Sequence, residues 1–430
     1  MLSWPTGVFL TAALMLPIAN RAPEALASTD AAGGVSVAEY DLGDSAFEHE
    51  DLSGPVELRA TVHYPTDLAA GPFPVVFMVH GLWTSCADAA AQAAFDGALA
   101  ERGITERDLY SGVTGPSDEA PDEIFELLSP MAQWPCPDGV PAMRSDRGYG
   151  YLAEELGAHG IVVVSISADG LNSLGVAGGP RARVALLNEH VRMWSELATG
   201  SGPLVDAVVD QAGTAVGTNV GAALDLSRVG TLGHSRGADA VMTQASVAHL
   251  PEIPEGVTVR AVVGLGTPFP NIGVSEDLDQ YAPAPDIPFV TMYGTCDRGG
   301  FAGSSEADYI FEEAATRNEA TIRNVRLPGG NHNFFNTIWS PEGGVPGAYD
   351  DEARFGTPAA DGYCTSVVDG ATAEDVRLTE AEQRTMTTEY VVAFFDRYLN
   401  DVEANDALLD GQAPLAGVPV QPEVQVDVPA

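Results

Sequence analysis

Short stretches of consecutive apolar residues alternate along the chain with segments in which apolar residues recur every three or four positions. Residues 74–79 and 161–166 are apolar almost throughout, as is typical of parallel strands buried on both faces of a sheet. Because strands and helices alternate, the sequence predicts an α/β protein with a doubly wound, mostly parallel sheet flanked by helices. Further strands are expected at residues 35–40, 56–64, 259–264, 288–293 and 321–327, and helices at residues 86–100, 149–159 and 181–198.

Both ends of the chain depart from this alternation. Residues 1–27 are predicted to be a secretory signal peptide, because an apolar stretch too short to span a bilayer precedes a small-x-small cleavage site ending at Ala27. A membrane anchor is the alternative. The last predicted helix opens with a capping box at Thr379. We therefore expect one folded domain at residues 28–402, and a disordered acidic tail at residues 403–430, where no periodicity is present.

A long irregular segment, residues 84–146, interrupts the alternation. It begins with an alanine-rich stretch of helical character and continues through acidic and proline-containing stretches. A loop of this length inside a compact domain usually has a function or a structure of its own. We interpret it as an insertion that lies near the mouth of a site. The alternative is a surface excursion remote from any chemistry.

The charge balance narrows the possible partners. The 430 residues include 61 acidic and 20 basic residues, a formal net charge of −41, and every basic residue is arginine. Such a surface should repel nucleic acid and anionic membranes, so neither is expected as a partner once the signal peptide is removed. An acidic surface is compatible with life in high salt, although genome composition would also explain the absence of lysine.

The candidate chemistry is concentrated at Gly233-His234-Ser235-Arg236-Gly237, between an apolar stretch and a helix-forming one. This G-x-S-x-G pattern is typical of a strand–turn–helix nucleophile elbow. The glycines are needed because side chains there would collide with the neighbouring backbone. The serine would stand at a helix N-terminus, where negative charge is favoured. A chance match is the alternative, and the strand–helix setting argues against it.

Two further residues complete a candidate catalytic triad. Asp297 follows the strand at residues 288–293, and His332 follows the last strand, in the order Ser, Asp, His of α/β-hydrolases. His332 would act as general base toward Ser235, and Asp297 would hold the imidazole in the required tautomer. Asp308 and Glu306 are weaker alternatives for the acid.

An oxyanion hole and a substrate pocket are expected beside the triad. The backbone N–H groups of Leu82 and Arg236 are the candidate donors to the developing oxyanion. Trp83 and Phe334 flank the oxyanion and base loops, where they would line an apolar acyl pocket or belong to the core. The Arg236 side chain would bind a carboxylate of the substrate or pair with a nearby acidic residue.

The chain has four cysteines, Cys86, Cys136, Cys296 and Cys364. An even number of cysteines in an exported protein favours two disulfides, for which three pairings are possible. We favour Cys86–Cys136 and Cys296–Cys364, because the members of each pair lie on the same side of Ser235. The first bridge would staple the insertion, and the second would tether the loop that carries the candidate acid.

These motifs, together with His80-Gly81 and the stretch at residues 147–153, resemble secreted bacterial α/β-hydrolases of the polyester hydrolase, chlorophyllase and platelet-activating-factor acetylhydrolase-like branch. The resemblance covers roughly residues 55–400. It implies an α/β-hydrolase catalytic domain and a triad of Ser235, His332 and Asp297. Arg236 stands where polyester hydrolases usually carry a hydrophobic residue.

The sequence therefore predicts a secreted serine hydrolase, extracellular or periplasmic, that cleaves carboxylic esters through an acyl-enzyme intermediate. Its substrate would be a small-molecule or polymeric ester, and no cofactor or metal ion is expected. A serine peptidase or amidase of the same fold is one alternative. A non-catalytic binding protein of the hydrolase fold is the other.

Overall fold

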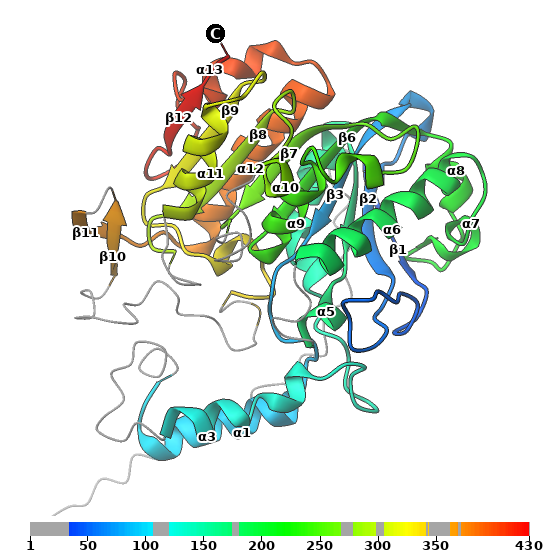
Figure 1. Ribbon diagram of the computed structural model, residues 1–430. Helices are drawn as coiled ribbons and strands as arrows, with labels where there is room; N and C mark the ends of the chain where they lie inside the picture. The colour runs from blue at the N-terminus through cyan, green and yellow to red at the C-terminus, as the bar shows by residue number, and fades with distance from the viewer. Residues whose placement is uncertain are drawn as a thin grey trace, which may run out of the picture.

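A large sheet with helices on both faces forms the body of the protein (Figure 1). The computed structural model describes residues 34–105, 120–173, 180–267, 278–297, 305–340, 343, 362–368 and 371–429. The signal peptide predicted at residues 1–27 lies outside the described residues, and that prediction stays open. Within the part of the chain that is described, no helix combines the length and the apolar character needed to cross a membrane.

Ten described strands form the main sheet, in the order β12-β9-β8-β7-β6-β3-β4-β2-β1-β5. Its centre is parallel from β4 through β3, β6, β7 and β8 to β9, and the pairs at both edges are antiparallel. The strands are β1 (Val35–Asp41), β2 (Arg59–Pro65), β3 (Phe73–Val79), β4 (Val162–Ile166), β5 (Val209–Asp210), β6 (Leu224–His234), β7 (Val259–Leu265), β8 (Phe289–Gly294), β9 (Ile322–Leu327) and β12 (Glu423–Asp427), and β10 (Tyr363–Val368) and β11 (Ala371–Val376) form a separate hairpin.

The helices lie in the connections between these strands. The α-helices are α1 (Ala89–Arg102), α3 (Ala120–Glu126), α4 (Gly150–Ala158), α5 (Asp169–Ser173), α6 (Pro180–Ala198), α7 (Leu204–Ala207), α8 (Gly217–Gly221), α9 (Arg236–Gln244), α10 (Leu278–Tyr281), α11 (Ser305–Ala315), α12 (Glu380–Leu399) and α13 (Asp406–Leu409). The described 3-10 helices are η1 (Leu68–Ala70), η2 (Ser129–Ala132), η3 (Ser145–Tyr149), η5 (Leu250–Glu252), η6 (Asn333–Phe335) and η8 (Glu403–Asn405). The capping box expected at Thr379 is present at the start of α12.

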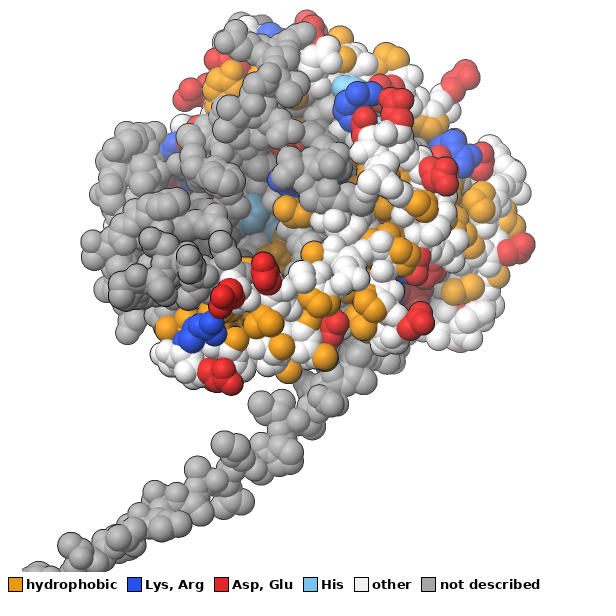
Figure 2. Space-filling model, turned by 60° about the horizontal axis from the view of Figure 1, so that its bottom comes forward, with side chains coloured by type: hydrophobic (Ala, Val, Ile, Leu, Met, Phe, Trp, Pro, Cys, Tyr) orange, Lys and Arg blue, Asp and Glu red, His pale blue; other side chains and the backbone are white. Residues whose placement is uncertain are grey.

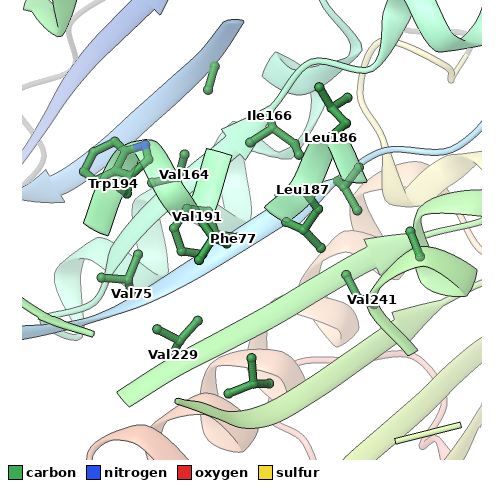
Figure 3. Packing of buried hydrophobic residues seen from close by; sticks show 14 of the residues in the cluster. Val75, Phe77, Val164, Ile166, Leu186, Leu187, Val191, Trp194, Val229 and Val241 are labelled. Carbon is green, nitrogen blue, oxygen red and sulfur yellow. The ribbon is translucent and has the colours of Figure 1, made fainter. Parts of the chain in front are cut away.

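The two faces of the sheet carry separate hydrophobic cores, which explains the continuous apolar runs in the sequence. From β3, Phe77 enters the core beneath α6, α9 and α11, whereas Met78 enters the core beneath α4 and α12. Figure 3 shows the first of these cores, in which Leu187 and Trp194 of α6 pack over Phe77 and Val164. A strand covered on both sides has no polar face, so the prediction of a doubly wound, mostly parallel sheet is confirmed.

The 84–146 insertion carries structure of its own. Helices α1 and α3 lie against each other and project from one end of the body (Figure 1). The predicted disulfide Cys86–Cys136 is confirmed, with the two Cα atoms 5.6 Å apart. Met131 and Met143 form a small core against which Trp83 and Ile338 pack. The base of the insertion therefore contacts the segments that follow the candidate oxyanion and base positions.

The prediction of a disordered tail at residues 403–430 is wrong for residues 403–429. This segment contains η8, α13 and β12, and β12 pairs antiparallel with β9 at the edge of the sheet. Leu409 is buried, and its carbonyl oxygen accepts a hydrogen bond of 2.7 Å from the Tyr390 hydroxyl. The ordering comes from pairing with a strand a hundred residues away, which local composition does not reveal.

Candidate active site

Ser235 stands between β6 and α9 in a conformation that few residues other than glycine adopt. Its φ is 56° and its ψ is −127°, and its backbone N–H donates to the carbonyl oxygen of Leu265 at 2.8 Å. A Cβ atom on Gly233 would lie 2.0 Å from the Gly237 carbonyl oxygen, and one on Gly237 would lie 2.1 Å from that of Val79. The turn therefore excludes a side chain at both positions where the sequence has glycine.

His332 and Asp297 meet beside this turn. The Nδ1 atom of His332 lies 2.8 Å from Oδ2 of Asp297, and each residue is 8% exposed. Gly266 follows β7 and packs so closely that an added Cβ would lie 2.9 Å from His332 Nδ1. The His332 ring lies 5.0 Å, centroid to centroid, from that of His234, the residue before Ser235. The structure thus brings the three predicted triad residues to one end of the sheet.

Asp308 and Glu306 are the alternative candidates for the acid, and Asp308 has no described contact with His332. Asp308 accepts a hydrogen bond from the Tyr293 hydroxyl at 2.9 Å and lies 3.1 Å from Nη2 of Arg326. Those contacts are on β8 and β9, and Asp297 is the carboxylate that contacts the His332 ring. The side chain of Glu306 lies outside the described part of α11.

His234 connects the elbow to the loop that carries His332, and sequence reasoning missed this contact. Its Nε2 atom lies 2.9 Å from the carbonyl oxygen of His332, and its Nδ1 atom lies 3.0 Å from the Tyr149 hydroxyl. Because a carbonyl oxygen only accepts, Nε2 carries the proton and Nδ1 accepts from Tyr149. Burial, and then the neighbouring His332, hold the pKa of His234 well below its usual value, so the ring is neutral.

The remainder of the His332 loop is held by elements far away in the sequence. The Gln383 side chain of α12 donates to the Asn331 carbonyl oxygen and accepts from the Asn331 N–H, each at 2.7 Å. The Asn336 amide donates to the Ser145 carbonyl oxygen at 3.0 Å. The loop is therefore fixed on both sides of the histidine.

The segment after β3 lies directly against the elbow. A Cβ atom on Gly81 would lie 2.5 Å from Cβ of Ser235 and 3.0 Å from the backbone nitrogen of Arg236. The neighbouring His80 accepts a 2.7 Å hydrogen bond from the Ala168 N–H at Nε2, so its proton is on Nδ1. Burial, and then the charge of Arg183, lower the pKa of His80 to about 3. Arg183 donates to the His80 carbonyl oxygen at 2.8 Å and so holds the strand end in place.

Buried carboxylates lie behind this segment. Glu57 accepts hydrogen bonds from Ser167 Oγ at 2.7 Å and from the Gly170 N–H. Burial, followed by the charge of Glu57, raises the pKa of Asp169 to about 8. Within the described part of the chain, no group of three or more His, Cys, Asp or Glu residues is arranged to hold a metal ion.

The second disulfide links the loop of the candidate acid to a hairpin. Cys296 and Cys364 are bonded, as predicted, with Cα atoms 5.7 Å apart, and the Cys296 N–H donates to the Gly330 carbonyl oxygen at 2.9 Å. The adjacent Thr295 donates through Oγ1 to Asp375 of β11 at 2.5 Å. The hairpin of β10 and β11 is thus attached to the residues immediately before Asp297.

The aromatic residues expected to line a pocket have distinct positions. Trp83 stacks on Trp339, with ring centroids 5.6 Å apart, and Trp339 is fully buried against the His234 ring. Phe334 is half-buried in η6, whereas its neighbour Phe335 is fully buried. Trp339 was missed, since nothing in its local sequence distinguishes it from a core residue. In Figure 2 a histidine side chain is visible on this side of the molecule, with hydrophobic side chains next to it.

Strand order, a parallel centre and the serine elbow together define the fold. The chain has the α/β-hydrolase fold. A protein from Klebsiella pneumoniae subsp. pneumoniae, provisionally named a dienelactone hydrolase, is similar in structure at 14% identity, with 70% of this chain and 88% of that chain covered and a TM-score of 0.34. Esterase Est22 is similar at 12% identity, with 72% and 77% covered and a TM-score of 0.35. No protein-family model matches the sequence, and neither does any curated protein.

Proposed function

We propose that the protein is a serine hydrolase that cleaves carboxylic esters through an acyl-enzyme intermediate. The observation that carries this proposal is the 2.8 Å contact between His332 and Asp297, placed beside a serine with φ of 56° at the start of α9. Three residue types with matching roles, drawn from the ends of three strands, form a nucleophile, a base and an orienting acid.

The tautomer of His332 follows from its partner. Asp297 Oδ2 is a carboxylate oxygen that accepts, so Nδ1 of His332 donates and the unprotonated Nε2 can act as a base. In the proposed first step, Nε2 removes the proton from Ser235 Oγ as Oγ attacks the ester carbonyl carbon. The tetrahedral intermediate then expels the alcohol, which takes the proton back from the imidazolium, and the acyl group remains on Ser235. Water, deprotonated by the same histidine, then attacks the acyl carbon. The bond from that carbon to Ser235 Oγ breaks, Oγ takes the proton back from the imidazolium, and the acid is released.

Backbone donors would stabilise the tetrahedral intermediate. The proposed oxyanion hole consists of the N–H of Arg236, at the start of α9, and the N–H of Leu82. The close packing of Gly81 on the elbow supports this assignment, because it brings the two segments within van der Waals contact. The α9 N-terminus adds a favourable field for the negative oxygen. One such donor typically contributes about 3 kcal/mol to transition-state stabilisation.

A direct test uses short p-nitrophenyl esters and a fluorophosphonate probe. The wild type should release a burst of p-nitrophenol as the acyl-enzyme forms, and it should become labelled at Ser235 by the probe. Ser235→Ala should abolish labelling and lower kcat by about a million-fold, and His332→Ala should lower it by a similar factor, since triad members act as a unit. Absence of turnover and of label in the folded wild type would reject the proposal. Cleavage of matched amides at comparable rates would instead favour the peptidase alternative.

Export is part of the proposal. Two disulfides are typical of proteins that fold in an oxidising compartment, and residues 1–27 have the pattern of a cleaved leader. The mature protein would begin at Ser28, and mass spectrometry of the secreted protein tests this. The resemblance to polyester hydrolases and their relatives supports ester substrates, and Arg236 in place of a hydrophobic residue argues for a substrate more polar than an aliphatic polyester.

A further inference from the structure

Positive charge is scarce in this protein, and most of it is neutralised locally. The chain has 20 arginines, no lysine and 61 acidic residues. Most described arginines contact a carboxylate, as Arg59 does with Asp41 at 2.7 Å and Arg144 with Asp146 at 2.9 Å. The guanidinium of Arg236 differs, because it has no hydrogen bond or ion pair among the described residues.

Arg236 also differs in its position. It is the first residue of α9, directly after Ser235, and its side chain is half-buried. Cα–Cβ bonds of an α-helix tilt toward the helix N-terminus, so a side chain at the first position leans toward the end at which Ser235 stands. The guanidinium therefore belongs to the surroundings of the proposed nucleophile.

A second guanidinium reinforces the positive charge at this place. Arg183 is 2% exposed, and it donates to two neutral acceptors, the His80 carbonyl oxygen at 2.8 Å and the Asn172 amide oxygen at 3.0 Å. Burial, and then the charge of Arg236, lower the pKa of Arg183 to about 10, so it stays cationic at neutral pH. The charges of Asp239 and Glu57 partly oppose this lowering of the Arg183 pKa.

A half-buried cation without a carboxylate is costly, because it loses hydration and gains no partner. Repulsion from Arg183 adds to that cost. In a protein with three acidic residues for every basic one, an acidic partner for Arg236 would be easy to supply. A guanidinium beside a nucleophile is instead suited to a ligand carboxylate, which its planar fork binds with two parallel hydrogen bonds.

We propose that Arg236 binds a free carboxylate of the substrate, so that the enzyme prefers anionic esters such as the half-esters of dicarboxylic acids. This inference rests on the proposed serine hydrolase function and adds a substrate class to it. The ester carbonyl would face Ser235, while the carboxylate at the other end of the same acyl group contacts the guanidinium. The backbone N–H of Arg236 would then donate a hydrogen bond to the oxyanion, and its side chain would select the acyl group.

The test compares two chromogenic esters that differ in one charge. 4-Nitrophenyl hydrogen glutarate carries a free carboxylate, and methyl 4-nitrophenyl glutarate has that carboxylate masked. The wild type should have a higher kcat/KM for the anionic ester. Arg236→Gln should lower the ratio of the two kcat/KM values by about tenfold to a hundredfold, as expected for a lost hydrogen bond to a charged group, and mostly through KM. Arg236→Lys should restore part of the ratio, because it keeps the charge without the fork.

Arg260→Gln is the matched control. Arg260 is an exposed arginine of β7, also without a described carboxylate partner, and its loss changes the net charge of the protein by the same amount. This variant should keep the wild-type ratio. A ratio near one in the wild type would overturn the inference. An equal loss on both esters in the folded Arg236 variants would overturn it as well, because the side chain would then only support the oxyanion donor.

The two proposals fail differently. If the wild type cleaves neither ester and Ser235 is not labelled by the fluorophosphonate, the serine hydrolase function itself is wrong. If both esters are cleaved at equal rates and Ser235 is labelled, the hydrolase function stands and the preference for anionic substrates is wrong. If Arg236→Gln does not fold, Arg236→Lys still tests the inference. Lysine keeps the charge but lacks the planar guanidinium, so its ratio of the two kcat/KM values should lie below that of the wild type.

Discussion

Gln383 holds the peptide next to the candidate base through both ends of its amide group. It is fully buried in the first turns of α12, and its two hydrogen bonds to Asn331 are each 2.7 Å long. A single rigid amide that bonds both the N–H and the carbonyl of one residue leaves that residue little freedom to rotate. Because His332 is the next residue, we expect Gln383 to position the candidate base.

Replacing Gln383 with Met should therefore damage activity beyond its effect on stability. The variant removes both hydrogen bonds to the Asn331 backbone, which costs about 1–3 kcal/mol for each, and it loosens the His332 loop. We expect kcat on a p-nitrophenyl ester to fall at least tenfold at a temperature where the variant remains folded, with KM little changed. Thr387→Val is the control, since Thr387 is buried one turn further along α12 and its hydroxyl donates within that helix, to the Gln383 main-chain carbonyl oxygen at 2.8 Å, and not to the His332 loop among the described residues. A loss of activity equal in both variants would contradict the positioning role.

The loop that carries the candidate acid is fixed by a disulfide as well as by hydrogen bonds to neighbouring strands. Asp297 lies in the connection after β8, one residue beyond Cys296, whose disulfide reaches Cys364 in β10. The Thr295 hydroxyl bonds β11 on the same side. The other disulfide joins Cys86 to Cys136 within the insertion, and neither cysteine is adjacent in sequence to a residue of the candidate triad.

The two disulfides should thus contribute differently to function. Removing either one should destabilise the protein by about 2–4 kcal/mol, because it relaxes a constraint on the unfolded chain. The Cys296→Ser, Cys364→Ser pair should additionally slow fluorophosphonate labelling of Ser235, since the acid loop loses its tether. The Cys86→Ser, Cys136→Ser pair is the matched control. Labelling rates that fall equally in both double variants, measured well below their melting temperatures, would contradict the assignment.

At the scale of the whole molecule, buried histidines make stability sensitive to acid. Burial lowers the pKa of His63 to about 4 and, as the largest contribution, those of His80 and His190 to about 3. An unfolded histidine titrates near 6.5, so below that pH the unfolded chain takes up protons that the folded chain refuses. Burial, as the largest contribution, raises the folded pKa of Asp169 to about 8 and also raises that of Glu57, so each group adds stability as the pH falls through its folded pKa.

The histidines outnumber the opposing acids, so the free energy of unfolding should decline as the pH falls from 6.5 toward 4. Each buried histidine lowers it by about 1.4 kcal/mol per pH unit in that range, and the loss is complete only below the folded pKa. Urea unfolding at pH 7 and pH 5 measures the decline. Between pH 7 and pH 5, the free energy of unfolding of His63→Leu should fall by about 2 kcal/mol less than that of the wild type. An equal decrease in the free energy of unfolding of the variant and the wild type would contradict the titration of His63.

Local patterns predicted most of the fold because they depend on local physics. Strands β3 and β4 are covered on both faces, so their sequences are apolar throughout, and glycines at 233 and 237 are required by the turn itself. β12 was missed because its residues alternate between acidic or polar side chains and valine on an exposed edge. Whether such a segment forms a strand depends on a partner that lies far away in the sequence.

By itself, the sequence determined the α/β architecture, the serine elbow, the candidate acid and base, and the favoured cysteine pairing. Each of these depends on a stretch of apolar residues, on a turn that requires glycine, or on the order of residues along the chain. Only the tertiary structure decided what holds these groups. His234 contacts the His332 carbonyl oxygen, and Gln383 holds the neighbouring Asn331 through two hydrogen bonds. The guanidinium of Arg236 has no hydrogen bond or ion pair with any described residue. Such relations depend on the packing of whole elements, which no local pattern encodes.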